Sequence, residues 1–183
     1  YEMEAIWQAT DNLRFTVAVS DNETTYDVPP GLIFGRCPVV YRGTDRCVFV
    51  DGNELIDLAG KTRPNAPELM YVLAARYRFD IGRSGYSGSV ALNHKFKDDT
   101  LKGLDQDPLR AIDAQDVTNL NLVVISPSDR FRWNLFVKNL FDERLIRARN
   151  YNPSGNLGGR IVEALNRNYE RYWGGSVTIS FGR

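Results

Sequence analysis

Apolar and polar residues alternate along several stretches of this chain. From Leu13 to Ser20, apolar side chains occupy every second position, and arginine, threonine, alanine and serine stand between them. The alternation recurs from Phe131 to Lys138 and from Ser176 to Phe181. Because neighbouring side chains of a β-strand point to opposite faces, each stretch is predicted to form a strand with one apolar and one mainly polar face.

This pattern predicts an all-β chain with no helix of consequence. It places seven strands, near residues 1–9, 12–26, 66–79, 85–97, 116–126, 130–141 and 168–181. Several exceed the average strand of a soluble protein, which has about 5–6 residues. A tilted strand that crosses a membrane needs about 9–11 residues. The lengths therefore favour the wall of a transmembrane barrel.

The connections between the predicted strands alternate in length. Short links rich in turn-forming residues follow the first, third and fifth strands, at 9–11, 80–84 and 127–129. Long links follow the second, fourth and sixth strands, at 27–65, 98–115 and 142–167. In an antiparallel meander, all short turns then lie at one end and all long loops at the other. Bacterial outer-membrane barrels have this asymmetry, with short periplasmic turns and long extracellular loops.

Composition and charge narrow the class of protein. The 183 residues carry 23 basic and 23 acidic side chains, a balance that argues against a nucleic-acid-binding protein. No run of 18 apolar residues occurs, so no transmembrane helix is predicted. The strand pattern opens at Tyr1 with no secretory leader before it, so either the chain is cytosolic or its N-terminal part is missing. The strand pattern favours a missing N-terminal part.

Aromatic residues gather near the ends of the predicted strands. They are Trp7, Tyr26, Tyr77, Phe79, Tyr86, Phe131, Trp133, Tyr169 and Trp173. Amphipathic rings favour the boundary between lipid and water. The same residues also fit the cross-strand aromatic pairs of a soluble sheet, and both interpretations stay open.

Three stretches resemble the TonB-dependent outer-membrane receptors. The segment VKNLFDER at 137–144 follows FRWNLF and is similar to the next-to-last strand of these receptors. Its family motif comprises Lys138, Asn139, Leu140, Phe141, Asp142 and Glu143. The segment Asn65-Ala66-Pro67 followed by Tyr77-Arg78-Phe79 resembles an earlier strand, and WQATDNL at 7–13 resembles a hairpin before it.

The resemblance implies a fold and a function. It makes residues 1–183 the last seven strands of an up-and-down 22-strand barrel, an incomplete barrel without the plug domain that fills such receptors. It implies energy-coupled uptake of a scarce nutrient across the bacterial outer membrane, with a ferric siderophore as the best-guess cargo. The partners would be the missing N-terminal barrel and plug, and TonB through that absent plug. The chain would be a fragment, a truncated gene product or one piece of a split receptor.

The end of the chain resembles the signal that the barrel-assembly machinery reads in outer-membrane proteins. Its residues are Gly174, Val177, Ile179 and Phe181. Two further residues, Gly182 and Arg183, follow the aromatic residue that ends the signal in such proteins.

Cys37 and Cys47 lie close together in a loop-like stretch and are predicted to form a disulfide, which favours an oxidising compartment. The alternative is a pair of free thiols. No histidine lies nearby to complete a metal site. The chain's single histidine, His94, shares the parity of Val90 and Leu92 and is expected at the barrel wall or rim.

Ligand-binding candidates lie in the first and last long loops. They are Arg36, Tyr41, Arg42 and Arg46, with Arg147, Arg149, Tyr151 and Arg160. Arginine forks and tyrosines suit an anionic, oxygen-rich ligand such as a ferric siderophore. The alternative is that these arginines pair with lipopolysaccharide phosphates or are solvated.

Other charged residues are expected to serve structure or solvation. Loop carboxylates that suit Ca²⁺ by chemistry but lack the EF-hand spacing are Asp98, Asp99, Asp105, Asp107 and Asp113, and we favour a solvated acidic loop. A wet barrel interior is predicted to be lined by Glu2, Glu4, Arg14, Arg132 and Lys138. No catalytic motif, metal site or cofactor site is recognised, so no enzyme is predicted.

Two rival architectures remain. A complete small outer-membrane barrel with a structural or adhesion role needs an eighth strand, for which 47–50 within 32–50 is the candidate. A soluble, carbohydrate-binding β-sandwich needs the apolar faces of its strands to pack against one another.

Overall fold

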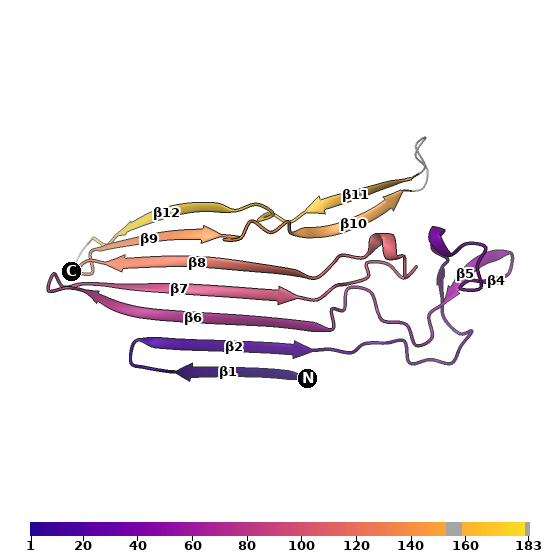
Figure 1. Cartoon of the computed structure of the whole chain (residues 1–183), viewed down its shortest axis with the longest axis horizontal. Helices are drawn as coiled ribbons and strands as arrows, with labels where there is room; N and C mark the ends of the chain where they lie inside the picture. The colour runs from indigo at the N-terminus through magenta and orange to yellow at the C-terminus, as the bar shows by residue number, and fades with distance from the viewer. Residues whose placement is uncertain (153–158, 182–183) are drawn as a thin grey trace.

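Most regular structure of the chain lies in one antiparallel sheet. The computed structural model describes residues 1–152 and 159–181. Seven strands pair in the order β1-β2-β6-β7-β8-β9-β12 (Figure 1). Their bounds are Glu2–Gln8 (β1), Leu13–Asp21 (β2), Leu69–Ile81 (β6), Tyr86–Lys97 (β7), Gln115–Ile125 (β8), Phe131–Lys138 (β9) and Tyr172–Ile179 (β12). All seven predicted strands are present in sequence order, so the prediction of an antiparallel all-β fold is confirmed.

Two small sheets lie beyond one end of the large sheet (Figure 1). The first has the order β3-β5-β4 and comprises Phe34–Arg36 (β3), Val48–Val50 (β4) and Asn53–Asp57 (β5). The second is the hairpin of Ile146–Asn152 (β10) and Arg160–Leu165 (β11). Two single-turn 3-10 helices, Val39–Tyr41 (η1) and Pro108–Arg110 (η2), complete the described elements. Among residues 1–152 and 159–181, no helix has the length and apolar character that crossing a membrane requires.

The connections of the large sheet are sorted by length, as predicted. Short turns join β1 to β2, β6 to β7 and β8 to β9 at one end, and the long connections that carry the small sheets leave from the other (Figure 1). We call these the short-turn end and the long-loop end. Strand β2 ends at Asp21 rather than near residue 26, because the following segment joins the loops: Tyr26 N–H donates to the Lys61 carbonyl (3.0 Å).

The register of the large sheet separates its two faces. Val17 pairs with Leu73, which pairs with His94, and Leu92 pairs with Leu120 in β8. Aliphatic side chains therefore form continuous rows across one face, called here the apolar face. This face remains uncovered in the described part of the chain: Leu92 is 41 % and Leu135 is 57 % exposed. Within residues 1–152 and 159–181, no second sheet packs on this face, as a sandwich requires.

The candidate eighth strand does not join the large sheet. Val48–Val50 does form a strand, but it pairs with β5 in the three-stranded loop sheet. Asp51 and Gly52 connect the two strands with φ of 50° and 77°, the backbone of a tight type I′ hairpin. The strands of this hairpin pair within the loop sheet and do not join the large sheet. β1 and β12 remain its edges among the described residues, so the sheet lacks the eighth strand that the rival small-barrel architecture needs.

The family motif ends β9 through one buried side chain. Asn139 is fully buried and adopts φ of 53°, a left-handed conformation that asparagine tolerates better than most residues. Its Nδ2 donates to the carbonyls of Glu143 (2.7 Å) and Asn168 (3.3 Å), and its Oδ1 accepts from the Glu143 N–H (2.9 Å). This side chain therefore ties the end of β9 to the segment that leads into β12.

The rest of the motif continues this turn. Asp142 also has a positive φ, of 62°, and its Oδ1 accepts from the backbone N–H of Arg171 (2.6 Å). Leu140 N–H donates to the Thr118 carbonyl (2.7 Å), which holds the segment against β8. The motif is therefore the point where β9 ends and the last long loop begins, rather than part of a strand that reaches residue 141.

We expect Asn139→Ala to destabilise the chain by about 2–4 kcal/mol, because three hydrogen bonds are lost at a buried site and their backbone partners stay unsatisfied. Urea unfolding followed by tryptophan fluorescence measures the change. Asn150→Ala, at an exposed position of β10, is the matched control and is expected within about 0.5 kcal/mol of wild type. Equal effects of the two substitutions would contradict the structural role of Asn139.

Candidate functional site

Aromatic rings border the apolar face at its short-turn end. Trp7 of β1 stacks on Phe15 of β2, with ring centroids 5.4 Å apart. Farther along the same end, Trp133 lies 6.1 Å from Tyr86 and 5.8 Å from Phe131. These residues come from strands that are far apart in the sequence, and the register brings them to one margin of the sheet.

A second aromatic group borders the long-loop end of the same face. Tyr71 of β6 stacks on Phe96 of β7, with centroids 4.9 Å apart, and Trp173 of β12 is 82 % exposed. Along β7, Tyr86 and Phe96 are separated by a rise of about 33 Å at about 3.3 Å per residue. At the strand tilt of a closed barrel, about 40°, this length would correspond to about 25 Å, which is the height of the apolar band of outer-membrane barrels.

His94 lies within the second aromatic group, on the apolar face, as its parity predicted. Its Nδ1 is 2.9 Å from Thr118 Oγ1 and 3.8 Å from Asp116 Oδ2, and its ring centroid is 5.8 Å from that of Tyr71. The three polar groups occupy the margin of this face, next to the loops. The chain's one histidine therefore lies at the long-loop margin of the large sheet and contacts local partners.

The long loops have a hydrophobic core of their own, separate from the large sheet. Its buried apolar residues come from all three long connections: Cys37, Ile56, Leu58, Ile112 and Leu145. The backbone packs closely here, since a Cβ atom on Gly35 would lie 2.3 Å from the Leu104 carbonyl oxygen. The loops therefore form one body, which we call the loop body.

The predicted disulfide between Cys37 and Cys47 is present in the loop body, with Cα atoms 5.9 Å apart. It joins the end of β3 to the start of β4. In the chain-entropy model a bridge over a loop of this size contributes about 2–3 kcal/mol.

Polar contacts connect the first two long loops. Asn65 N–H donates to the Leu101 carbonyl (2.8 Å), and Gln106 Nε2 donates to the Thr62 carbonyl (2.9 Å). The Lys102 ammonium donates to Asn65 Oδ1 (2.9 Å). Burial, and then the positive charge of Lys97, lower the pKa of Lys102.

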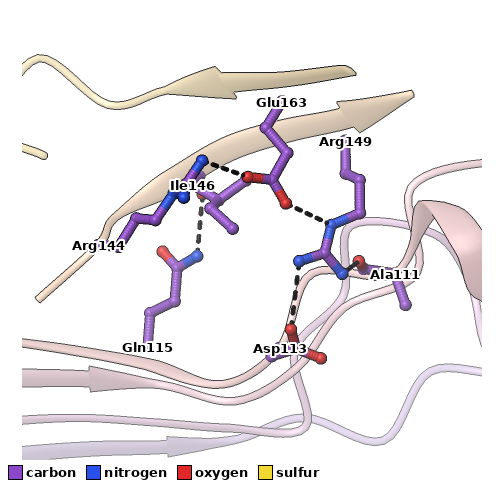
Figure 2. A network of polar contacts seen from close by, with 7 residues as sticks. All are labelled: Ala111, Asp113, Gln115, Arg144, Ile146, Arg149 and Glu163. Carbon is purple, nitrogen blue, oxygen red and sulfur yellow. Dashed lines mark hydrogen bonds and ion pairs between the residues drawn. The ribbon is translucent and has the colours of Figure 1, made fainter. Parts of the chain in front are cut away.

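Arg149 of β10 connects the last loop to the rest of the loop body (Figure 2). Its Nε donates to Glu163 Oε1 of β11 (3.1 Å), its Nη1 to the Ala111 carbonyl (2.7 Å) and its Nη2 to Asp113 Oδ2 (3.3 Å). The Arg149 side chain is only 18 % exposed. Its donors are thus directed at protein partners and away from solvent.

Two further contacts complete this network in Figure 2. Arg144 pairs with the second oxygen of Glu163 (2.9 Å), and Gln115 Nε2 at the start of β8 donates to the Ile146 carbonyl (3.1 Å). The β10–β11 hairpin is therefore anchored both to the second loop and to the end of the large sheet.

The remaining ligand-binding candidates are divided between two parts of the loop body. Arg36, Arg42 and Arg46 are exposed around the loop sheet, and the Arg46 guanidinium lies 4.7 Å above the Tyr41 ring. Arg147 and Arg160 are exposed on the β10–β11 hairpin, where Tyr151 is half-buried. No hydrogen bond or ion pair joins the two groups within residues 1–152 and 159–181, and their role in ligand binding stays a prediction.

The loop carboxylates do not converge on a common point. Asp105 pairs with Arg110 (2.7 Å), Asp107 accepts from the Leu109 N–H at the start of η2 (3.0 Å), and Asp113 pairs with Arg149. Among the described residues, the one cluster of metal-type ligands comprises Cys37, Cys47 and Glu54, and its two sulfurs are bonded to each other.

The predicted lumen-facing residues share one face of the large sheet, called here the polar face. They are Glu2, Glu4, Arg14, Arg132 and Lys138. The sequence prediction missed two further arginines of this face, Arg76 and Arg78 of β6. The alternation around Tyr77 contained the signal, because the residues on either side of a strand residue point to the opposite face from that residue.

The predicted assembly-signal residues lie in and after β12. Val177 and Ile179 face the apolar side, and Phe181 is exposed. Gly174 lies on the polar face, where a Cβ atom would be 2.8 Å from the Phe136 ring, so the close packing explains the glycine. Gly182 and Arg183 lie outside the described residues.

We expect Arg149→Gln to release the β10–β11 hairpin, because Glu163 and Asp113 lose their shared charge partner and about 2–3 kcal/mol of local stability. Limited proteolysis and hydrogen exchange of residues 146–165 report this release. Arg147→Gln, two residues away on the same strand but exposed, is the matched control. Faster exchange in both variants, or in neither, would show that Arg149 is not the anchor.

Comparisons of the chain with protein-family models, with curated proteins and with solved structures found no match.

Proposed function

We propose that this chain is part of the wall of a TonB-dependent outer-membrane receptor, which takes up a scarce nutrient with energy from the inner membrane. One observation carries the proposal. The apolar face of a single-layer sheet is uncovered among the described residues, and aromatic groups border it at both ends. They lie about 33 Å apart along the strands, which a barrel tilt of about 40° would reduce to about 25 Å across a membrane. The sorted connections and the motif at 138–143 agree with it.

Water is an unfavourable environment for the apolar face. Moving one leucine out of water contributes about 1.5–3 kcal/mol, and soluble monomers rarely expose apolar patches larger than a few hundred Å². Leu73, Leu92 and Leu135 are exposed on this face together with their apolar neighbours. In contact with hydrocarbon, the same apolar surface carries no such free-energy cost, and the fold needs no change.

Strand direction restricts how the wall is completed. Seven antiparallel strands leave β1 and β12 running the same way, so pairing β1 directly with β12 would be parallel. Open edges in lipid cost several kcal/mol for each unpaired backbone group. An antiparallel closure needs an odd number of further strands, with both outer strands running toward the long-loop end. A second copy of this chain could pair with both edges in antiparallel fashion only if it were inverted. Its long loops would then lie on the opposite side of the membrane from those of the first copy.

The completing strands therefore belong to a different sequence, in the same protein or in another chain. In the proposed receptor this is the N-terminal barrel portion, which also carries the plug that contacts TonB. The barrel-assembly machinery and lipopolysaccharide are the other proposed partners.

The proposed cargo is a ferric siderophore, which the loop body would contact from outside the membrane. Exposed guanidinium groups and the Tyr41 ring suit anionic, oxygen-rich ligands of this class. The disulfide and the Arg149 network fix the loop body, so its ligand groups are pre-positioned before binding.

We expect Leu92→Arg to cost about 2–4 kcal/mol when the chain is folded in lipid vesicles, because an arginine would then face the centre of the hydrocarbon. Urea unfolding from vesicles measures this cost. Asn93→Arg is the matched control: the neighbouring residue is also exposed but lies on the polar face, where a charge is tolerated. Equal tolerance of both substitutions would contradict a membrane-facing apolar side.

Uptake is tested in the source bacterium. We expect deletion of the segment that encodes residues 1–183 to abolish growth on at least one ferric siderophore as the iron source, and to leave growth on free iron unchanged. Radiolabelled iron uptake with hydroxamate and catecholate siderophores measures the loss. Unchanged uptake of every siderophore would remove iron transport from the proposal.

A further inference from the structure

Four arginines gather on the polar face near the short-turn end. Arg14 of β2 lies directly opposite Arg76 of β6 in the register, and Arg78 follows two residues later on the same face. Arg132 of β9 lies four strands from β2 on this face. We call these four residues the arginine cluster.

Small residues between the arginines leave three adjoining hollows on the polar face. Arg76 and Arg132 both line a hollow of about 340 Å³, together with Ser89 and Ala91 of the intervening strand β7. Arg78 and Arg132 line an adjoining hollow, and Arg14, Arg76 and Arg78 line a third. The three hollows therefore form one continuous surface across the sheet.

The positive charge of the cluster is not compensated. Within residues 1–152 and 159–181, no hydrogen bond or ion pair is made by the side chains of Arg14, Arg76, Arg78 or Arg132. Among the described residues, Asp80 is the one carboxylate that lines any of these hollows. It lines the hollow that contains Arg78 and Arg132, and it forms no ion pair with either. Like charges directly opposite each other destabilise a sheet. The opposed Arg14 and Arg76 are therefore unfavourable for the isolated sheet.

The extent of the cluster indicates the kind of anion that fits it. From β2 to β9 the surface spans about 19 Å, at about 4.8 Å for each strand. A single phosphate or carboxylate is too small to meet all four guanidinium groups. A polypeptide that carries several carboxylates matches both the length of the surface and the separate positions of the charges, and guanidinium binds carboxylate through paired hydrogen bonds.

We infer that the arginine cluster is a docking surface for an acidic protein segment, whose aspartate or glutamate side chains pair with Arg14, Arg76, Arg78 and Arg132. The inference rests on the proposed function in one respect: it takes the polar face to be the interior of the wall, which lipid head groups do not reach. The occupant neutralises charges that the sheet itself leaves unpaired.

Binding of a probe peptide tests the inference. A fluorescent 12-residue poly-L-glutamate peptide is titrated into the full chain folded in neutral detergent. We expect the double substitution Arg76→Gln and Arg132→Gln to weaken its binding at least about tenfold, since two charge-assisted contacts are lost. The matched control is Lys95→Gln with Lys97→Gln, which removes two charges from the other end of the same face and should change affinity less than about twofold.

Three outcomes would overturn the inference. Equal weakening by the two double variants would mean attraction by overall charge alone. Tripolyphosphate that binds as tightly as the peptide, with the same dependence on Arg76 and Arg132, would indicate a small-anion site. Binding to anionic lipid vesicles through these arginines would indicate a lipid contact.

A stability measurement separates docking from a structural role. Without peptide, Arg76→Gln relieves the repulsion with Arg14 and should raise the urea midpoint of unfolding, whereas Lys95→Gln should leave it unchanged. A lower midpoint for Arg76→Gln would show that the arginine supports the sheet and would overturn the inference. If only this inference fails, Leu92→Arg still destabilises the chain in lipid vesicles. If the proposed function fails, Leu92→Arg and Asn93→Arg have the same effect on stability.

Discussion

The pairing of backbone N–H and C=O groups between antiparallel strands is the constraint on which this molecule depends. Each strand in the seven-strand sheet has its register set by its neighbours, and a shift of one residue would exchange the two faces. The register collects Leu73, Leu92 and Leu120 on one side, and Arg14, Arg76 and Arg132 on the other. Both the apolar face and the arginine cluster follow from that single arrangement.

The same backbone demand explains the proposals about partners. Strands β1 and β12 each present one unpaired edge among the described residues, and their common direction selects what can pair with them. In the proposed receptor the two faces meet different environments: the aliphatic rows face hydrocarbon, and the arginines face an aqueous, acidic surface. A wall that is closed by other strands and filled by another segment supplies both environments at once.

The loop body is built on a different principle. Its strands are short, and it is held by a small buried core, the disulfide and the Arg149 network rather than by a large sheet. Arg149 shows how the structure changes the interpretation of a loop arginine. Its sequence context resembles that of Arg147, yet its donors are directed at Glu163, Asp113 and Ala111, while Arg147 is exposed.

The sequence by itself determined the seven strands, their faces and the sorting of the connections, because a period of two is a local property that each stretch carries alone. The sequence also contains the Asp51-Gly52 pair, which is typical of a tight hairpin turn but is easily missed when only long strands are sought. Only the tertiary structure decided that Arg76 lies opposite Arg14, that Asn139 is buried, and that Val48–Val50 pairs within the loops. These facts depend on contacts between residues that are distant in the sequence, and a local sequence pattern does not specify such contacts.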